Sequence, residues 1–324
     1  MNANSDNVLE VLAFSLAFRV REKLLFAVRN VNLNVPSGLI ACLVGESGCG
    51  KSVTCRSILK LEPPGSITQG EIIFKGQNLL AMPEKKLRSI RGSSIGMIFQ
   101  EPMTSLNPVL TIGDQTAEPL RLHLGMNKSE AREKTLDLFS LVGIPDPKSR
   151  IDNYPHQLSG GMRQRVMIAM AISCNPALLL ADEPTTALDA TIQGQILRLL
   201  VEMGRRQNMA LLLITHDLGI VADVADHVNV MYAGIIVESA PARKLFMEPL
   251  HPYTRALLSC APGNHSWTKA TLPTIPGTVP TLDAMPTGCP FAPRCSFAMP
   301  VCRSELPPML NSDNRQVACW LYKK

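Results

Sequence analysis

Short apolar runs alternate with longer amphipathic segments along most of the chain. Residues 177–181 and 210–215 are almost continuously apolar and are bounded by polar residues, as is typical of strands buried on both faces of a sheet. Residues 40–44 form another short apolar run. Further β-rich runs separated by turns fill residues 8–96, and residues 162–238 alternate strand and helix signals. This alternation predicts an α/β fold.

Residues 97–157 show a helical pattern instead, which is clearest over residues 128–142. Ser129 stands near the start of that stretch and is the expected N-cap. The apolar positions of the stretch are spaced to share one helix face: Ala131, Leu136, Leu138, Phe139 and Val142. We therefore expect a helical region between the two strand-rich parts of the chain.

Beyond Glu248 the composition changes. Prolines become frequent, and four of the nine cysteines lie after residue 288. Proline fixes its own backbone and donates no amide hydrogen bond, so such a segment forms few regular elements. The tail is predicted to be a loop-rich module appended to the α/β core.

Composition and charge narrow the possible functions. The chain has 324 residues, 46 % of them hydrophobic and 18 % charged, and a net charge of +5 spread along its length. A nucleic-acid binder more often concentrates its basic residues, so none is expected as a partner. No run approaches the roughly 18 apolar residues that a membrane-spanning helix needs. The polar N-terminus lacks the features of a signal peptide, and the protein is expected to stay in the cytosol.

Residues 45–52 read Gly-Glu-Ser-Gly-Cys-Gly-Lys-Ser and match the phosphate-loop pattern in full. An apolar strand leads in and a helical segment leads out, which is the context that the pattern requires. The glycines allow backbone N–H groups to approach phosphate oxygens closely. Lys51 is placed to reach the β- and γ-phosphates, and the Ser52 hydroxyl to bind Mg²⁺. A glycine-rich turn without a ligand is the weaker alternative.

Two further segments carry chemistry of the same kind. Asp182 ends an apolar strand, where its carboxylate can hold Mg²⁺, and Glu183 follows as a candidate base for the attacking water. Taken alone, this pair is more often a surface feature at a strand end. Ser159 stands before Gly160 and Gly161 at a predicted helix start, where the exposed amides suit an anion. Simple helix capping is the alternative there.

Six segments, in this order along the chain, resemble the motifs of the ATP-binding cassette (ABC) family. Residues 45–52 resemble Walker A, Gln100 the Q-loop, and residues 158–162 the family signature. Residues 178–182 with Glu183 resemble Walker B and the catalytic glutamate. Asp189 fits the D-loop and His216 the switch histidine. The resemblance implies a P-loop NTPase core of the RecA-like type over residues 1–244, with an inserted helical subdomain at about 97–165.

The resemblance also implies how such a site works. Two cassettes pair head to tail, and each ATP lies between Walker A of one chain and the signature of the other. Glu183, His216 and Gln100 are the implied catalytic residues, and Ser52, Gln100 and Asp182 the implied Mg²⁺ ligands. The implied nucleotide contacts are Gly45, Glu46, Ser47, Gly48, Cys49, Gly50, Lys51, Ser52, Val53, Gln100, Asp182, Ser159, Gly160, Gly161 and Asp189.

More specific segments point to one branch of the family. Residues 99–108, 251–254, 275–277 and 288–291 are similar to the ATP-binding "D" subunits of oligopeptide and dipeptide importers, and residues 245–324 to their C-terminal extension. This branch implies two permease subunits, an extracytoplasmic substrate-binding protein and a second ATPase, identical or sibling. It places the protein peripherally on the cytoplasmic face of the inner membrane. Nickel, glutathione and antimicrobial-peptide systems share the extension, so the cargo stays open.

Two features of the resemblance are carried by less specific residues. Family members stack adenine on an aromatic ring, and Phe18 and Phe26 are the candidates for this ring here. Each of the two is equally suited to be a core residue. The tail cysteines Cys289, Cys295, Cys302 and Cys319 are spaced more widely than most metal-binding pairs. The resemblance implies that they bind a 4Fe-4S cluster, which gives the extension a metal site made of four cysteines.

Two other classes of function remain as alternatives. A non-transport ABC ATPase that acts on nucleic acid or ribosomes usually has tandem cassettes, coiled coils or basic arms, and this sequence shows none of these. A sensing module with a vestigial ATPase is disfavoured because Glu183 and His216 are both present. The expected activity is ATP hydrolysis coupled to peptide import.

Overall fold

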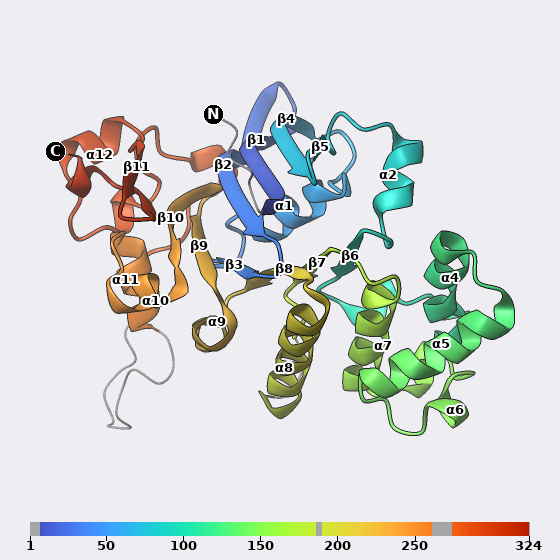
Figure 1. Ribbon diagram of the computed structural model, residues 1–324. Helices are drawn as coiled ribbons and strands as arrows, with labels where there is room; N and C mark the ends of the chain where they lie inside the picture. Colours follow the sequence, from blue (N-terminus) through green and yellow to red (C-terminus); the bar gives the residue numbers. More distant parts are fainter. Residues whose placement is uncertain (1–6, 186–189, 261–273, 324) are drawn as a thin grey trace. The chain divides into compact units, whose positions relative to one another are not determined.

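The computed structural model describes residues 7–185, 190–260 and 274–323 (Figure 1). The chain divides into two compact units. The first comprises Met1–Val8, Val35–Leu39 and Ala81–Leu213, and the second comprises Leu9–Asn34, Ile40–Leu80 and Ile214–Lys324. Each unit combines strands and helices, which confirms the predicted α/β class.

The first unit is built on three neighbouring strands in the order β8-β7-β6. β6 (Ile95–Ile98) pairs in parallel with β7 (Leu178–Asp182), and β8 (Ala210–Thr215) follows β7 in the sheet. Every residue of β7 and β8 is buried. The nearly continuous apolar runs predicted these strands, because a strand that is covered on both faces has no polar side.

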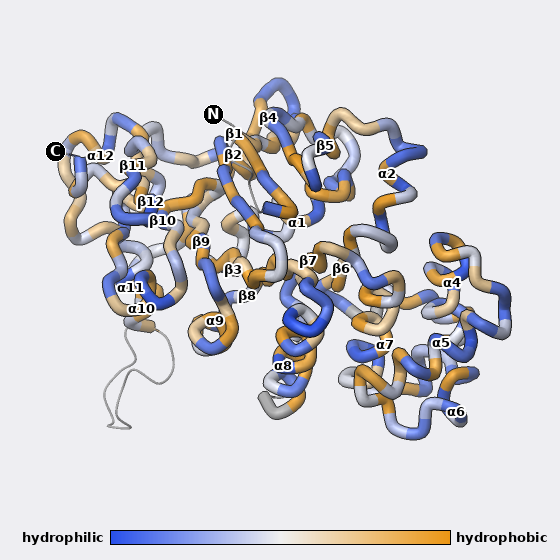
Figure 2. The backbone as a smooth tube through the Cα atoms, viewed as in Figure 1, coloured by the Kyte–Doolittle hydropathy of each residue, from blue (hydrophilic) through white to orange (hydrophobic). Residues whose placement is uncertain are grey.

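The helices of the first unit lie mostly between β6 and β7 along the chain. α4, α5 and α7 contact one another pairwise, and α7 also packs against β6 (Figure 1). α8 shows alternating orange and blue positions along its length in Figure 2, as expected for an amphipathic helix. The helices are α2 (Glu84–Ile90), α3 (Pro102–Ser105), α4 (Ile112–Leu124), α5 (Lys128–Leu141), α6 (Pro147–Arg150), α7 (Gly160–Ile172) and α8 (Ala190–Gln207), with a 3-10 turn, η1, at Pro155–Gln157.

The start of α5 corrects one prediction. Its N-cap is Asn127 and not Ser129, because the Asn127 side chain accepts hydrogen bonds from the amides of Ser129 and Glu130, both at 3.0 Å. The Glu130 carboxylate in turn accepts from the Asn127 amide at 2.8 Å. This reciprocal capping box satisfies more orphan amides than Ser129 could.

The second unit contains two groups of paired strands. The first group is an antiparallel sheet with the strand order β2-β1-β4-β5. The second group has the strand order β11-β12-β10-β9-β3, and within it β3 and β9 are parallel. The strands are β1 (Asn7–Val20), β2 (Lys23–Pro36), β3 (Ile40–Val44), β4 (Ile67–Phe74), β5 (Gln77–Asn78), β9 (His227–Tyr232), β10 (Ile235–Pro241), β11 (Met309–Ser312) and β12 (Arg315–Ala318). The helices are α1 (Lys51–Ile58), α9 (Leu218–Val224), α10 (Ala242–Met247), α11 (Pro252–Ser259) and α12 (Pro300–Ser304), with 3-10 turns at Leu282–Ala284, Ala292–Arg294 and Trp320–Tyr322.

The described parts of the proline-rich tail are rich in loops, as predicted, but they also extend the sheet of their unit. β12 pairs antiparallel with β10, with Val317 opposite Glu238, and β11 pairs with β12. Val317 is almost wholly buried. The sequence did not predict this hairpin, because its strands are short and only partly apolar.

None of the described helices is long and apolar enough to cross a membrane.

Candidate functional site

The phosphate-loop sequence lies between β3 and the first turn of α1, the context that its pattern requires. Two of its glycines are needed for steric reasons. Gly50 has φ 106°, a conformation that side chains disfavour, and a Cβ atom at Gly45 would lie 2.2 Å from the Met231 carbonyl oxygen. The loop therefore runs directly against its neighbouring backbone, where a side chain would find no room.

Lys51 sits at the centre of the loop. Its side chain is buried, and Nζ donates to the carbonyl oxygens of Gly45 at 2.8 Å and Glu46 at 2.9 Å. A buried ammonium needs such oxygen partners. A phosphate group would offer stronger, charged acceptors in exchange for the two neutral carbonyls.

Glu46 is held by two residues from the far end of the sequence. Its amide donates to the Tyr253 hydroxyl at 3.0 Å. Its carboxylate accepts two hydrogen bonds from the Arg294 guanidinium, at 2.8 and 3.0 Å. Arg294 was not predicted as a site residue, because a phosphate-loop pattern leaves the residue at position 46 unspecified and 248 residues separate it from Arg294.

In the first unit, the acidic pair at the end of β7 meets Gln100. Asp182 is fully buried, and Glu183 is half-buried. The Gln100 amide Nε2 donates to Glu183 Oε2 at 3.1 Å. Glu183 also has φ 47°, an uncommon conformation for a residue with a side chain. Strained backbone of this kind is often found where a side chain has to point in one functional direction.

The Ser159 segment forms the start of α7. Ser159 is the N-cap, and its hydroxyl accepts from the Met162 amide at 3.3 Å. Ser159 and Gly160 are exposed, and a Cβ atom added to Gly160 would meet nothing within 4 Å. The N-terminal end of this helix is thus open to a ligand from outside the chain.

His216 lies in the second unit, exposed, in the turn between β8 and α9. Asp217 caps α9 by accepting from the Gly219 amide at 2.9 Å, which fixes the turn that presents the histidine. Asp189, the remaining candidate of this group, lies outside the described residues.

One of the two aromatic candidates lines an open groove. Phe18 borders it together with Arg19, Arg21, Pro64, Gly65 and Ile67, all in the second unit. Phe26 lies half-buried in β2. Phe18 is half-buried as well, so what distinguishes it from Phe26 is the groove with its two arginines, which suit an anionic ligand.

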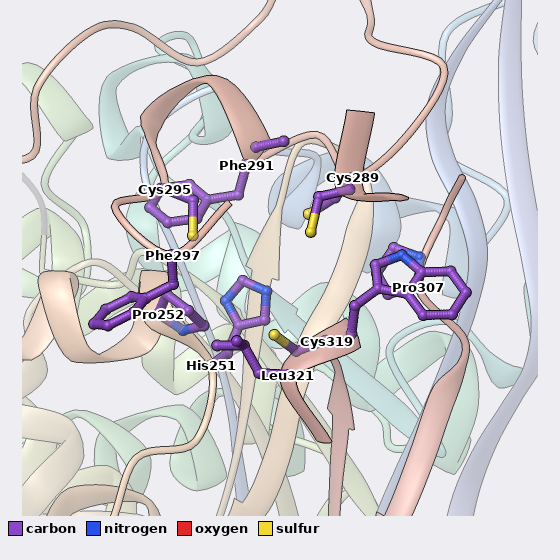
Figure 3. A pocket seen from close by; sticks show the side chains of 12 residues that line it. His251, Pro252, Cys289, Phe291, Cys295, Phe297, Pro307, Cys319 and Leu321 are labelled. Atoms are coloured by element: carbon purple, nitrogen blue, oxygen red, sulfur yellow. The ribbon is translucent and has the colours of Figure 1, made fainter. Parts of the chain in front are cut away.

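The four tail cysteines are close to one another, but the predicted 4Fe-4S cluster is wrong. Cys289, Cys295, Cys302 and Cys319 line a cavity of ≈ 20 Å³, and Figure 3 shows sulfur atoms turned toward the same space beside the His251 ring. Among the described residues, no group of three or more His, Cys, Asp or Glu side chains is arranged to hold a metal ion.

The surroundings of these thiols explain the difference. Burial raises the pKa of Cys289 to about 11, and it also raises the pKa values of Cys295 and Cys319. Metals bind thiolates, whereas protonated thiols pack as small hydrophobic groups. Among the described residues, the arrangement of side chains therefore gives no support for the cluster. Among the other cysteines, Cys42, Cys49 and Cys55 are buried, as expected for packing residues.

Comparison with known proteins places these features in context. Residues 28–186 match the family model described as ABC transporter, and residues 237–302 match "Oligopeptide/dipeptide transporter, C-terminal region". A probable peptide ABC transporter ATP-binding protein of Sinorhizobium fredii is 50 % identical over 98 % of this chain and 96 % of its own length. The dipeptide transport ATP-binding protein DppD of Bacillus subtilis is 50 % identical over 98 % of this chain and 95 % of its own.

A solved structure resembles the chain at lower identity. It is a dimeric ATP-binding cassette in a post-hydrolysis state with bound ADP and phosphate. It is 28 % identical, covers 72 % of this chain and 99 % of its own, and superposes with a TM-score of 0.66. The similarity supports the P-loop α/β fold.

Proposed function

This chain belongs to the ABC transporter family, in the group with the oligopeptide/dipeptide transporter C-terminal region, and from this membership we propose how its residues divide the work. It is the ATP-binding and ATP-hydrolysing subunit of a peptide or dipeptide importer. The assignment of individual residues, the domain boundaries at 244 and 245, and the partners are our proposals.

The phosphate loop binds the nucleotide. Its amides surround the phosphates, from Gly45 to Val53, and Lys51 exchanges the carbonyls of Gly45 and Glu46 for phosphate oxygens. The buried, fully hydrogen-bonded ammonium is the single observation that carries this proposal, because the desolvation cost of the lysine is already met before ATP arrives.

The acidic pair performs hydrolysis. Glu183 accepts the proton of the attacking water, and the Gln100 amide holds its carboxylate in place at 3.1 Å. Ser52, Asp182 and Gln100 offer oxygen donors of the kind that Mg²⁺ prefers, and when bound the ion would neutralise phosphate charge. His216 stabilises the charge that develops on the γ-phosphate.

A second ATPase subunit completes the site. Ser159, Gly160 and Gly161 present an exposed helix start that would meet the γ-phosphate bound by the partner subunit, and Asp189 belongs to the same contact. The dimeric arrangement of the similar solved cassette supports this pairing. An identical or a sibling ATPase would serve.

The transporter context follows from the branch of the family. Two permease subunits and an extracytoplasmic substrate-binding protein complete the importer, and the ATPase sits peripherally on the cytoplasmic face of the membrane. The helical region at about 97–165 and the extension at 245–324 are the parts that distinguish this chain from a minimal α/β core. Cargo choice rests with the permeases and the binding protein, so nickel, glutathione or antimicrobial peptides remain alternative cargoes.

The test is ATP binding by the purified protein together with its ATPase partner and Mg²⁺. Lys51→Ala should weaken ATP binding by at least about tenfold, since it removes a charge-assisted contact. Lys128→Ala, at the first residue of the exposed α5 start, is the matched control and should keep the wild-type affinity. Equal affinity of the wild type and K51A would contradict the phosphate-loop assignment.

A further inference from the structure

The residue that follows the first glycine of the phosphate loop is fixed at three points. The Glu46 amide donates to the Tyr253 hydroxyl, its carbonyl accepts from Lys51 Nζ, and its carboxylate accepts from Arg294. Two of these three contacts come from the C-terminal extension. Backbone position and side-chain direction at residue 46 are therefore both set by residues outside the phosphate-loop motif.

Arg294 is itself held rigidly. Its side chain is only 4 % exposed, while that of Glu46 is 28 % exposed. The guanidinium also donates to the carbonyl oxygens of Pro276 at 2.9 Å and Ile275 at 3.2 Å, and to the Tyr232 hydroxyl at 3.3 Å. A planar guanidinium with so many fixed acceptors loses little further freedom when it binds a carboxylate with two parallel bonds.

Tyr253 is held by aromatic packing. It is fully buried, and its ring centroid lies 4.7 Å from that of Tyr232 and 5.3 Å from that of Phe291. Burial raises the pKa of Tyr253, so the phenol stays neutral at physiological pH. The same cluster of Tyr232, Tyr253 and Phe291 thus supports both residues that hold Glu46.

The negative charge of Glu46 disfavours phosphate binding, and Arg294 neutralises it. A carboxylate inside a loop whose amides collect a triphosphate repels that ligand at short range. The two-fold hydrogen bond of Arg294 neutralises the carboxylate and holds it on the side of the extension. Loss of the arginine would leave a partly buried carboxylate without compensation, next to the place where phosphate binds.

We propose that Arg294 and Tyr253 of the C-terminal extension are positioning residues for nucleotide binding, which hold residue 46 of the phosphate loop and neutralise its carboxylate. The inference rests on the proposed ATP site. It gives the extension a direct part in the ATPase and makes ATP affinity sensitive to the conformation of the segment that carries Arg294.

The test measures equilibrium binding of Mg-ATP to the protein with its ATPase partner, for four versions of the chain. R294M should bind ATP about tenfold more weakly, because the unpaired carboxylate repels the phosphates. E46Q alone should bind about threefold more tightly, since Arg294 is then an uncompensated positive charge. The double variant E46Q/R294M should regain most of the lost affinity, and the R294M defect should shrink at high salt.

A role in packing alone gives different results. The double variant would then stay as weak as R294M, and E46Q would lose affinity as well; either result overturns the proposal, as does wild-type affinity in R294M. R303M removes an exposed arginine from the same extension and should bind like the wild type. If R294M does not fold, the affinity of E46Q still tests the proposal. Failure of the wild type itself to bind ATP refutes the ATP site rather than this inference.

Discussion

The side-chain amide of Gln100 donates a hydrogen bond to the carboxylate of Glu183 at 3.1 Å, and thereby links the loop after β6 to the end of β7. The two strands are parallel neighbours, so their carboxyl ends meet at the same sheet edge. The contact fixes the direction of the carboxylate that we assign as the proton acceptor. This arrangement leads to two predictions about hydrolysis.

Glu183→Gln should lower the ATPase rate by about a hundredfold or more, because a neutral amide is unable to accept the proton of the attacking water. ATP binding should persist, since the phosphate loop is unaltered, and the ATP-bound dimer should accumulate. The measurements are steady-state phosphate release and size-exclusion chromatography with ATP. Glu133→Gln, at an exposed position of α5, is the control with the same charge change. Rapid residual turnover in E183Q would exclude Glu183 as the base.

Gln100→Ala should lower kcat by about tenfold, because the carboxylate of Glu183 loses the donor that orients it. The KM for ATP should change less than kcat if orientation of the base is the main loss. Gln115→Ala removes a different side-chain amide of the same unit, one that caps the Asn107 loop, and should reduce thermal stability more than kcat. Equal losses of kcat and of ATP affinity in Q100A would argue against a role specific to hydrolysis.

Gly50→Ala should destabilise the phosphate loop and abolish ATP binding. The backbone at this position has φ 106°, and the new Cβ atom would lie 2.9 Å from the Ala27 carbonyl oxygen. Each strain of this kind costs about 1–3 kcal/mol. Gly65→Ala is a useful comparison, since Gly65 also has positive φ but its Cβ atom would meet nothing within 4 Å. Thermal unfolding should rank the two variants, with G50A the less stable.

The burial of His251 predicts that acidic pH destabilises the second unit. Burial lowers the pKa of His251 from 6.5 to about 3, and its Nδ1 accepts from the Tyr253 amide at 3.0 Å, which requires the neutral ring. The unfolded chain therefore binds the proton first. The contribution of the neutral ring to the free energy of unfolding is fully present above pH 6.5 and is lost as the pH falls toward 3.

His251→Asn tests this contribution, because an asparagine oxygen can cap the same amide without titrating. The variant should lose less stability than the wild type when urea unfolding at about pH 7.5 is compared with unfolding at about pH 5. The phenol of Tyr253 gives no competing titration in this range, since its pKa is raised. An identical pH dependence of the two proteins would assign the acid sensitivity to other groups.

The sequence predicted the features that depend on local pattern. The strand leading into the phosphate loop and the Ser159 cap of α7 were predicted because a few adjacent residues determine them. Ser129 was the wrong cap, because reciprocal bonding between Asn127 and Glu130 competes better for the same amides. The contact of Arg294 with Glu46 was not predictable, since nothing near either residue in the sequence indicates its partner.

The tail cysteines show a second limit. The family resemblance implied that they bind a cluster, and the structure does bring them to one cavity beside His251. What the spacing did not reveal is the apolar lining of that cavity, where burial raises the pKa of Cys289. Protonation state depends on burial, and burial depends on contacts with segments far along the chain.

The pairing of β12 with β10 has a practical meaning for anyone who shortens this protein. A chain truncated at the start of the proline-rich segment would lack β12, and β10 would become an edge strand with unpaired backbone N–H and C=O groups. Such an exposed border recruits other polypeptides by strand addition. Truncated versions should therefore aggregate. Their low solubility would prevent such variants from testing what the extension does in transport.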